Sequence, residues 1–205
     1  MNVVVLLSGG IDSTVALAMV TANDNHAAMA LSFNYGQTHL RELDAAAAIA
    51  DHYDVHHRVI DLRAALSTPC ALTGNGHIPD SHATQVDATY VPGRNLVMLA
   101  VGVGVAAGLG AGAVIIGANA DDHAGYPDCR PNFIDSVDQT ARTSTDGHVG
   151  VSAPLVRMTK RDIVAVGRDL EVPLHLTYSC YRGGIDPCNR CGACESRNEA
   201  MAVTA

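Results

Sequence analysis

The sequence predicts an α/β fold, a doubly wound and mainly parallel sheet followed by a small cysteine-rich module. Short apolar, β-branched runs alternate with longer helix-like runs along most of the chain. This rhythm is typical of a parallel sheet with helices on both faces. It ends at Tyr178, beyond which four cysteines fall within residues 180–194. We therefore expect one main domain over residues 1–177 and a C-terminal module over residues 178–205 that packs on it.

The elements follow from the pattern in chain order. Valines and leucines over 3–7 predict the first strand, and Ser8-Gly9-Gly10 then predicts a tight turn into a helix over 13–22. The alternation continues as a strand over 28–33, a helix over 39–52, a strand over 55–60 and a helix over 95–108. It ends with a strand over 113–117, a helix over 131–143, a strand at about 149–152 and a helix over 160–170. The intervening segment from about 67 to 93 is long enough to predict a functional loop or a small excursion.

Residues 96–118 lack charged and polar side chains and are long enough for a membrane span. Six glycines interrupt this stretch, however, and Gly108-Leu109-Gly110-Ala111-Gly112 indicates the end of a helix. A buried helix followed by a buried parallel strand gives the same hydropathy, and this is the structure that we predict. The apolar N-terminus has no basic flank and predicts a strand rather than a signal peptide. A cytoplasmic protein without membrane contact is expected.

The charge balance favours a small-molecule ligand. The chain has 13 Lys and Arg residues against 21 Asp and Glu residues, a net charge of −8. An acidic protein of this kind disfavours broad contact with nucleic acid or an anionic membrane, because affinity for phosphate polymers is mostly electrostatic. Lys160 is the single lysine and follows Thr159, so the Gly-Lys-Ser/Thr of a Walker A loop is excluded. Thr159 and Asp162 resemble a capping box, which indicates that Lys160 begins a helix.

The segment from Ser8 to Thr14 is the first candidate site. Its glycines permit a tight strand-to-helix turn, and the free N–H groups at the start of the following helix can bind an anion. The alternative is a structural turn in which Asp12 or Ser13 caps the helix. Gly102-Val103-Gly104-Val105-Ala106-Ala107 fits a loose dinucleotide-binding pattern, but it lies inside a helical run, where small residues allow close packing.

The cysteines form the second candidate site. Cys180 precedes Cys188-x-x-Cys191-x-x-Cys194 among Gly, Pro and Asn residues. Four thiolates suit tetrahedral zinc. An iron–sulfur cluster and disulfides are the alternatives. The histidines show no metal-binding spacing, and Cys129 fits a small buried residue better than a nucleophile.

Further candidate residues gather in three motifs, 33–39, 90–95 and 117–130, each after a predicted strand or before a predicted helix. Their aromatic residues could stack on a flat heteroaromatic ligand, or could fill gaps at the bases of loops. Arg94 and Arg130 could bind phosphate or carboxylate, or form surface ion pairs.

Ser-Gly-Gly-x-Asp-Ser after a first apolar strand resembles the signature of the PP-loop ATP pyrophosphatases, which have an adenine nucleotide alpha hydrolase-like fold. This resemblance implies that ATP phosphates or a Mg²⁺ ion contact Ser8, Gly9, Gly10, Asp12, Ser13 and Thr14.

Nearly the whole chain, in order, resembles the 7-cyano-7-deazaguanine synthase family of queuosine biosynthesis, most specifically in Gly125-Tyr126-Pro127-Asp128-Cys129-Arg130 and Ser179-Cys180-Tyr181. The resemblance implies a homodimeric, ATP- and zinc-dependent ligase that converts 7-carboxy-7-deazaguanine and ammonia to the 7-nitrile. The implied catalytic residues are Asp12, Ser13, Arg94, Asp128 and Arg130. The implied substrate contacts are Tyr35, Gln37, Arg94, Tyr126, Asp128 and Arg130, and the implied zinc ligands are Cys180, Cys188, Cys191 and Cys194.

The implied reaction activates the substrate carboxylate with ATP, forms an amide with ammonia, and dehydrates the amide after a second activation. Two other functions are compatible with parts of the sequence. A PP-loop enzyme that modifies tRNA by thiolation or lysidine formation would share the phosphate loop, but should have a basic surface. A zinc-ribbon binding module without catalysis would need a phosphate loop that does not bind ATP.

Overall fold

The computed structural model describes residues 2–22, 28–66, 68–74, 76–80 and 88–202. Five parallel strands form one sheet in the order β3-β2-β1-β4-β5. They are β1 (Val3–Leu6), β2 (Ala28–Asn34), β3 (His56–Asp61), β4 (Ala113–Ile115) and β5 (Gly150–Ser152). All five predicted strands and the parallel sheet are confirmed.

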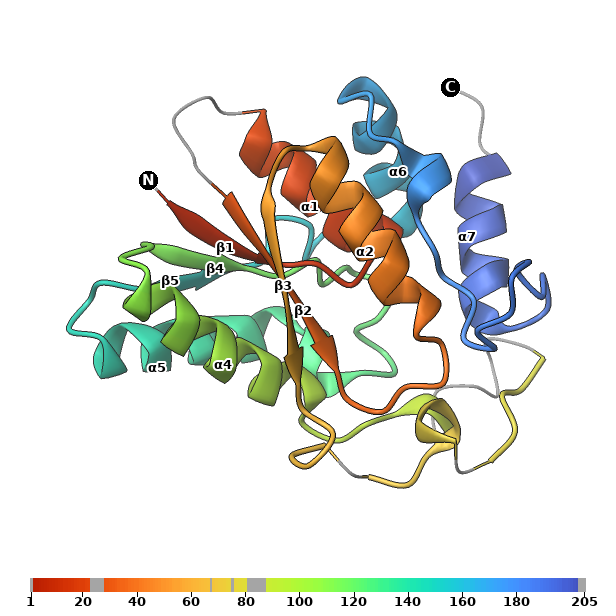
Figure 1. Ribbon diagram of the computed structural model, residues 1–205, viewed down its shortest axis with the longest axis horizontal. Helices are drawn as coiled ribbons and strands as arrows, with labels where there is room; N and C mark the ends of the chain where they lie inside the picture. The colour runs from red at the N-terminus through yellow and green to blue at the C-terminus, as the bar shows by residue number, and fades with distance from the viewer. Residues whose placement is uncertain (1, 23–27, 67, 75, 81–87, 203–205) are drawn as a thin grey trace.

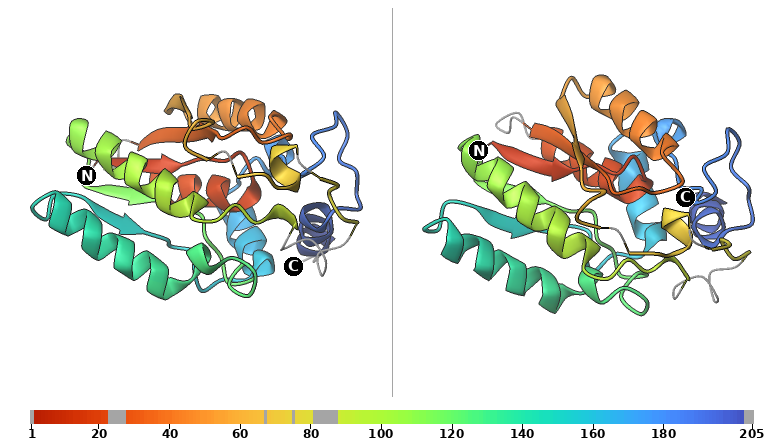
Figure 2. Two further views of the ribbon diagram at one scale, coloured as in Figure 1. Left: turned by 90° about the horizontal axis from the view of Figure 1, so that it is seen from below. Right: turned by 60° about the horizontal axis from the view of Figure 1, so that its bottom comes forward.

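Helices cover both faces of the sheet (Figures 1 and 2). On one face lie α1 (Ile11–Thr21), α2 (Arg41–His52) and α6 (Lys160–Asp169), and on the other α4 (Arg94–Gly108) and α5 (Pro131–Ser144). These five helices were predicted to within about two residues at each end. A further helix, α7 (Gly192–Ala202), packs against α6. The sequence pattern did not predict α7, because cysteines and charged residues obscure its helical period.

The alternation of side chains along β1 divides the core in two. Val4 and Leu6 face the side covered by α4 and α5, whereas Val3, Val5 and Leu7 face the side covered by α1, α2 and α6. This follows from the two-residue period of a strand, and burial on both faces explains the continuous apolar run that the sequence shows.

The uncharged run 96–118 forms most of α4 and then β4, as predicted. No helix among the described residues is long and apolar enough to span a membrane. A Cβ atom on Gly102 would lie 3.1 Å from Val114 and 3.2 Å from Leu6, so this glycine permits close packing of α4 on the sheet. The expectation of close packing does not hold for Gly104, which has nothing within 4 Å of a built Cβ.

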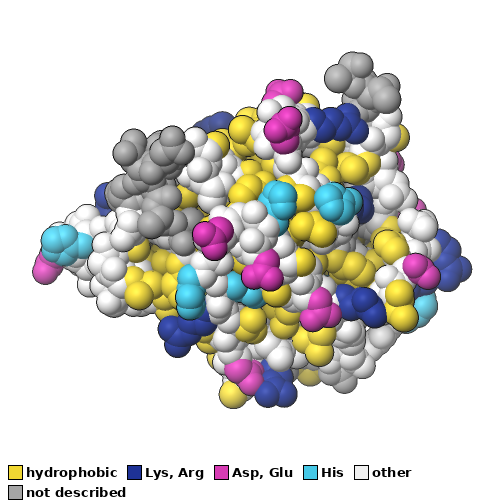
Figure 3. Space-filling model, turned by 45° about the horizontal axis from the view of Figure 1, so that its top comes forward, with side chains coloured by type: hydrophobic (Ala, Val, Ile, Leu, Met, Phe, Trp, Pro, Cys, Tyr) yellow, Lys and Arg dark blue, Asp and Glu magenta, His cyan; other side chains and the backbone are white. Residues whose placement is uncertain are grey.

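The loops after the strands and the cysteine-rich segment gather at one end of the sheet, opposite the N-terminus (Figure 1). The described parts of the predicted excursion contain a short 3-10 turn, Ala71–Thr73, and also lie at this end. On the face of the molecule that carries α1 and α2, acidic, basic and histidine side chains are interspersed over the described residues (Figure 3). The loops that gather beyond the carboxyl ends of the strands lie where open α/β sheets bind ligands.

Candidate active site and metal centre

A cavity of about 250 Å³ opens at the carboxyl ends of β1, β2 and β4. The β1–α1 loop contributes Ser8, Gly10, Asp12 and Ser13, and the region after β2 contributes Tyr35, His39 and Glu42. The start of α4, the segment after β4 and the start of α6 also line it. Residues from the cysteine-rich segment, among them Tyr178, Ser179 and Tyr181, complete the wall.

The β1–α1 loop is held in a tight turn. Gly9 has a φ of +83°, and a Cβ atom there would lie 2.2 Å from the carbonyl oxygen of Glu42. The Ser13 hydroxyl accepts from the N–H of Ser8 at 3.2 Å and lies 3.0 Å from the Ser8 hydroxyl. Thr14 donates its hydroxyl proton to the carbonyl of Gly10 at 2.7 Å and is fully buried. The hydroxyls of Ser8 and Ser13 therefore face the cavity, whereas Thr14 stabilises the turn from behind.

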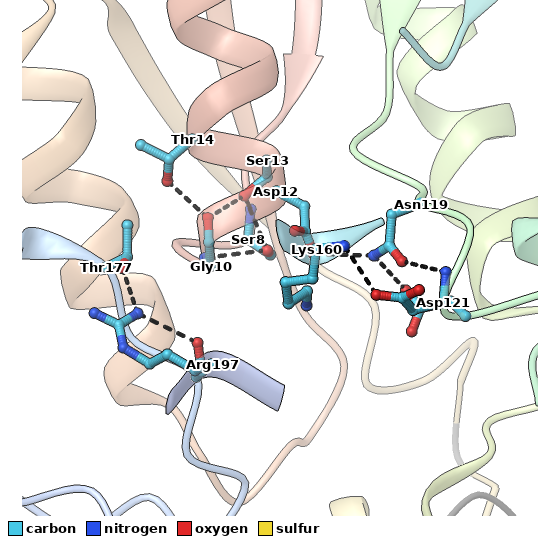
Figure 4. A network of polar contacts seen from close by, with 12 residues as sticks. Ser8, Gly10, Asp12, Ser13, Thr14, Asn119, Asp121, Lys160, Thr177 and Arg197 are labelled. Atoms are coloured by element: carbon cyan, nitrogen blue, oxygen red, sulfur yellow. Dashed lines mark hydrogen bonds and ion pairs between the residues drawn. The ribbon is translucent and has the colours of Figure 1, made fainter. Parts of the chain in front are cut away.

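Two long-range contacts converge on Asp12 (Figure 4). Lys160 Nζ lies 3.0 Å from Asp12 Oδ2, and the Asn119 side-chain amide donates to the same oxygen at 3.2 Å. The second oxygen, Oδ1, is buried and has no hydrogen-bond partner among the described residues. A buried carboxylate oxygen without a donor is unfavourable unless a ligand or cation contacts it, and oxygen ligands suit Mg²⁺. The chemistry of this group therefore fits a metal ion that accompanies phosphate.

Lys160 has two roles at the start of α6. Thr159 and Asp162 form the predicted capping box, and the backbone N–H of Lys160 donates to Asp121 Oδ2 at 2.8 Å. Its amine also lines the cavity, a role that the sequence analysis did not assign. Burial alone would lower the pKa of Lys160, but the carboxylates of Asp12 and Asp122 outweigh burial and raise this pKa. The amine is thus a positive charge beside the phosphate loop.

Tyr35 and Arg94 form the opposite part of the cavity. Arg94 Nη1 donates to the Tyr35 hydroxyl at 3.3 Å, and its guanidinium carbon lies 5.7 Å from the centre of the Tyr35 ring. Burial raises the pKa of Tyr35, although Arg94 partly opposes this effect. Cys129 also lines the cavity, and burial raises the pKa of its thiol to about 12. Cys129 is therefore a protonated, buried residue, which agrees with the prediction of a small buried residue rather than a nucleophile.

Four predicted substrate residues do not line the cavity. Gln37 is buried and accepts from the N–H of Tyr35, and Tyr126 lies 2.9 Å from the hydroxyl of Thr89. Asp128 Oδ2 accepts from the N–H of Asn95 at 3.0 Å and so satisfies a free donor at the start of α4. Arg130 is exposed and donates to the carbonyl of His123. Their roles in substrate binding stay predictions. Gln37 and Asp128 contact Tyr35 and Asn95, two residues that do line the cavity.

The cavity also contains a histidine–glutamate pair that sequence analysis did not identify. His39 Nε2 lies 3.2 Å from Glu42 Oε2, and the exposed fraction of the His39 side chain is only 3%. The rings of His39 and Tyr181 are 5.3 Å apart. Spacing of i and i+3 at the start of a predicted helix was the available signal, but it is common between surface residues and therefore weak.

The four cysteines of the C-terminal segment form one cluster. Their sulfur atoms all lie within 4.8 Å of one another, and Cys188 and Cys194 are 4.0 Å apart. Tetrahedral zinc with Zn–S bonds of about 2.3 Å needs sulfur atoms about 3.8 Å apart. All four thiols are unpaired, so the disulfide alternative is not observed. The backbone N–H groups of Cys188 and Cys191 donate to the sulfurs of Cys180 and Cys188, each at 3.3 Å. The donor set thus fits a structural metal ion.

The cysteine-rich segment is fastened to the sheet domain at several points. Tyr178 donates its N–H to Gly9 at 2.9 Å, and Thr38 donates its hydroxyl proton to the carbonyl of Tyr181 at 3.3 Å. A Cβ atom on Gly183 would lie 2.8 Å from the carbonyl oxygen of Thr38.

Arg197 extends this connection. It donates to the hydroxyl of Thr177 (Figure 4). It also donates to the carbonyl of Leu174 at 2.9 Å. Arg197 therefore joins α7 to the segment that precedes the cysteines. These contacts form because α7 folds back on the turn at 174–176, and no local sequence pattern indicates that arrangement.

Comparison with known sequences identifies relatives over nearly the full length. The family model described as queuosine biosynthesis protein QueC matches residues 2–205. A 7-cyano-7-deazaguanine synthase from Marinobacter nauticus is 42% identical over 206 residues, which cover 98% of this chain and 93% of the relative. Another, from Rhizobium meliloti, is 44% identical over 207 residues, with 98% and 87% coverage.

Solved structures share the fold at lower identity. The U34-tRNA thiolase NcsA from Methanococcus maripaludis, with its [4Fe-4S] cluster, has a TM-score of 0.58 and 20% identity, and covers 89% of this chain and 62% of its own. NMN synthetase from Francisella tularensis has a TM-score of 0.57 and 21% identity, with 99% and 72% coverage. At such identities the similarity concerns the fold alone.

Proposed function

The chain belongs to the family of queuosine biosynthesis protein QueC, and we propose that it forms 7-cyano-7-deazaguanine from 7-carboxy-7-deazaguanine and ammonia, with consumption of ATP. It is an enzyme, because its relatives are named 7-cyano-7-deazaguanine synthases, and the ATP-dependent carbon–nitrogen ligase class fits its family. No feature of the described residues favours a tRNA-modifying enzyme or a non-catalytic zinc ribbon.

The observation that carries the proposal is a single cavity that holds two different kinds of group. At one end, the Ser8–Ser13 turn, the start of α1 and Lys160 offer donors and positive charge to phosphate. At the other end, Tyr35, Tyr181 and Arg94 offer aromatic surface and a guanidinium group. A carboxylated heteroaromatic ring and ATP can therefore meet at one point, which this reaction requires.

Each residue then has a definite task. Ser8, Ser13 and the backbone of Gly10 donate to the phosphate chain, and Lys160 balances negative charge that develops during transfer. Arg94 holds the substrate carboxylate toward the phosphate, and Tyr35 orients Arg94 through its hydroxyl. Asp12, held by Lys160 and Asn119, is the residue that would hold Mg²⁺. That ion supplies Lewis-acid charge stabilisation to the phosphates when bound.

We further propose that Cys180, Cys188, Cys191 and Cys194 hold zinc as thiolates, which supports the wall that Tyr178 and Tyr181 form. Ammonia as nitrogen donor, a homodimer and a cytoplasmic location complete the proposal, and these rest on the family resemblance. Metal analysis of freshly purified protein separates the alternatives: about one zinc per chain supports the assignment, and iron contradicts it.

The decisive experiment is incubation with ATP, Mg²⁺, ¹⁵N-ammonium and 7-carboxy-7-deazaguanine, followed by mass spectrometry. We expect a nitrile that carries one ¹⁵N atom, together with consumption of ATP and no need for tRNA. Product that requires added tRNA would instead support the tRNA-modifying alternative. Release of the amide as the final species would show that the enzyme amidates a carboxylate but does not dehydrate it.

A further inference from the structure

The His39–Glu42 pair has no role in the proposed phosphate chemistry, yet several hydrogen bonds fix its position. Glu42 Oε1 accepts from the Gln37 side-chain amide at 2.8 Å, while Glu42 Oε2 lies against His39 Nε2. Gln37 is itself fixed, because its amide donates to the carbonyl of Phe33 and its oxygen accepts from the N–H of Tyr35. A chain of hydrogen bonds thus runs from β2 to one nitrogen of the histidine.

This anchoring determines the state of the ring. An ionised carboxylate only accepts hydrogen bonds, so the hydrogen-bond network assigns the proton to Nε2 and leaves a lone pair on Nδ1 in the neutral ring. Nδ1 is shielded from solvent and has no hydrogen-bond partner among the described residues. A buried acceptor without a donor is unfavourable, so a ligand that brings an N–H group to Nδ1 would remove that cost.

Several other titratable groups of the cavity already face a charged or hydrogen-bonding partner or stay protonated. Asp12 faces Lys160, and Asp122 accepts from the Asn119 amide at 2.8 Å. Burial raises the pKa of the Tyr35 phenol and of the Cys129 thiol, so these two groups stay protonated at neutral pH. Arg94 and Lys160 are cations. His39 lines the same cavity and offers a ring nitrogen, Nδ1, without a hydrogen-bond partner among the described residues.

We propose that His39, held by Glu42, is the general base that takes a proton from the incoming nitrogen nucleophile. The inference rests on the proposed function, which requires ammonia to attack an activated carboxyl carbon. Glu42 and Gln37 are positioning residues in this scheme, because they act through the imidazole and not on the substrate.

The step balances as follows. Nδ1 takes one proton from ammonium, which frees the nitrogen lone pair. The nitrogen forms a bond to the carboxyl carbon, while the bond from that carbon to the phosphate-bearing oxygen breaks and its electron pair leaves with the phosphate. The departing phosphate takes the second proton that the new amide must lose. The imidazolium returns its proton to water after the products leave.

The test compares two nucleophiles. Hydroxylamine is a weaker base than ammonia and is already unprotonated at neutral pH, so it needs no initial loss of a proton. His39→Gln keeps an N–H donor for Glu42 but lacks a basic nitrogen. We expect it to lower kcat/KM for ammonium about 100-fold. Hydroxamate formation from hydroxylamine, ATP and the substrate carboxylate should stay within about threefold of wild type.

Two further variants sharpen the comparison. Glu42→Gln should give an intermediate loss with ammonium, because the ring keeps a partner but loses the supporting charge. His56→Gln, at an exposed histidine of β3, is the matched control and should leave both reactions unchanged.

The outcomes are distinguishable. Equal losses with ammonium and hydroxylamine would mean that His39 shapes the cavity or binds the substrate ring, and would overturn the role as a base. Unchanged ammonium kinetics in His39→Gln would overturn it as well. If the wild type formed no hydroxamate and no nitrile, the proposed function itself would fail, and this role with it.

Discussion

Replacement of Lys160 by methionine should weaken both ATP use and the fold, because its amine lies 3.0 Å from the carboxylate of Asp12. With an effective dielectric constant of about 20, two unit charges at that distance attract by about 5–6 kcal/mol. Desolvation offsets much of this energy, and the two side chains are still 22% and 17% exposed. We therefore expect a net coupling free energy of about 1–3 kcal/mol between the two residues.

A double-mutant cycle measures that coupling. Urea denaturation of wild type, Lys160→Met, Asp12→Asn and the double variant gives the four unfolding free energies that the cycle needs. In parallel, kcat/KM for ATP in Lys160→Met should fall about 100-fold, since a preorganised charge beside the phosphates is lost. Arg161→Met is the matched control: it removes one positive charge from the next residue of α6, where the side chain is exposed. A coupling below about 0.5 kcal/mol, with ATP kinetics equal to those of the control, would refute this reasoning.

Three other outcomes are expected. Cys188→Ser should lose the bound metal and lower the thermal midpoint of unfolding, because a structural zinc site contributes much of a small module's stability. Cys70→Ala, outside the cluster, is the control and should keep the metal. Retention of a full equivalent of metal by Cys188→Ser would contradict the ligand set. Gly9→Ala should lower the free energy of unfolding by at least about 2 kcal/mol, because of its backbone conformation and the close carbonyl of Glu42. Gly104→Ala, with open space at its Cβ, should instead raise it by up to about 1 kcal/mol. Similar denaturation midpoints for both variants would contradict the turn geometry. Burial alone would raise the pKa of Asp138, but hydrogen bonds from Arg142 and from the N–H of Val151 lower it. The stabilisation from Asp138 should thus be complete above about pH 4 and disappear as the pH falls through its folded-state pKa, so the stability difference from Asp138→Asn must shrink in acid.

The order of strands and helices could be predicted because each element has its own local period. Val3 to Leu7 is apolar on both faces of a buried parallel strand, and Thr159 with Asp162 marks the start of α6 without any tertiary information. Helix α7 has no such period, because its eleven residues include Cys194 of the cysteine cluster, residues that pack on α6, and Arg197 with its contacts to residues 174–177.

The parts of the candidate site that lie within one short sequence segment were predicted. The parts that depend on contacts between distant residues were missed. The Ser8–Thr14 turn and the four cysteines are local, and the structure assembles both. The contact of Lys160 with Asp12 joins residues far apart in the chain, and sequence alone indicated only a helix start for Lys160. The family resemblance implied Asp128 and Gln37 as substrate contacts, which stays a prediction; in the structure their buried side chains accept from the backbone N–H groups of Asn95 and Tyr35.

The wall of the cavity has a consequence for biosynthesis of the protein. A ribosome releases residues 8–14 well before residues 178–193, although both segments line the same cavity. A nascent chain that has already paired all five strands therefore still presents an open trough, without Tyr178, Ser179 and Tyr181. Capture of the proposed metal ion by the four cysteines would then follow the pairing of the strands, so the supply of that ion would limit the fraction of chains that can turn over substrate.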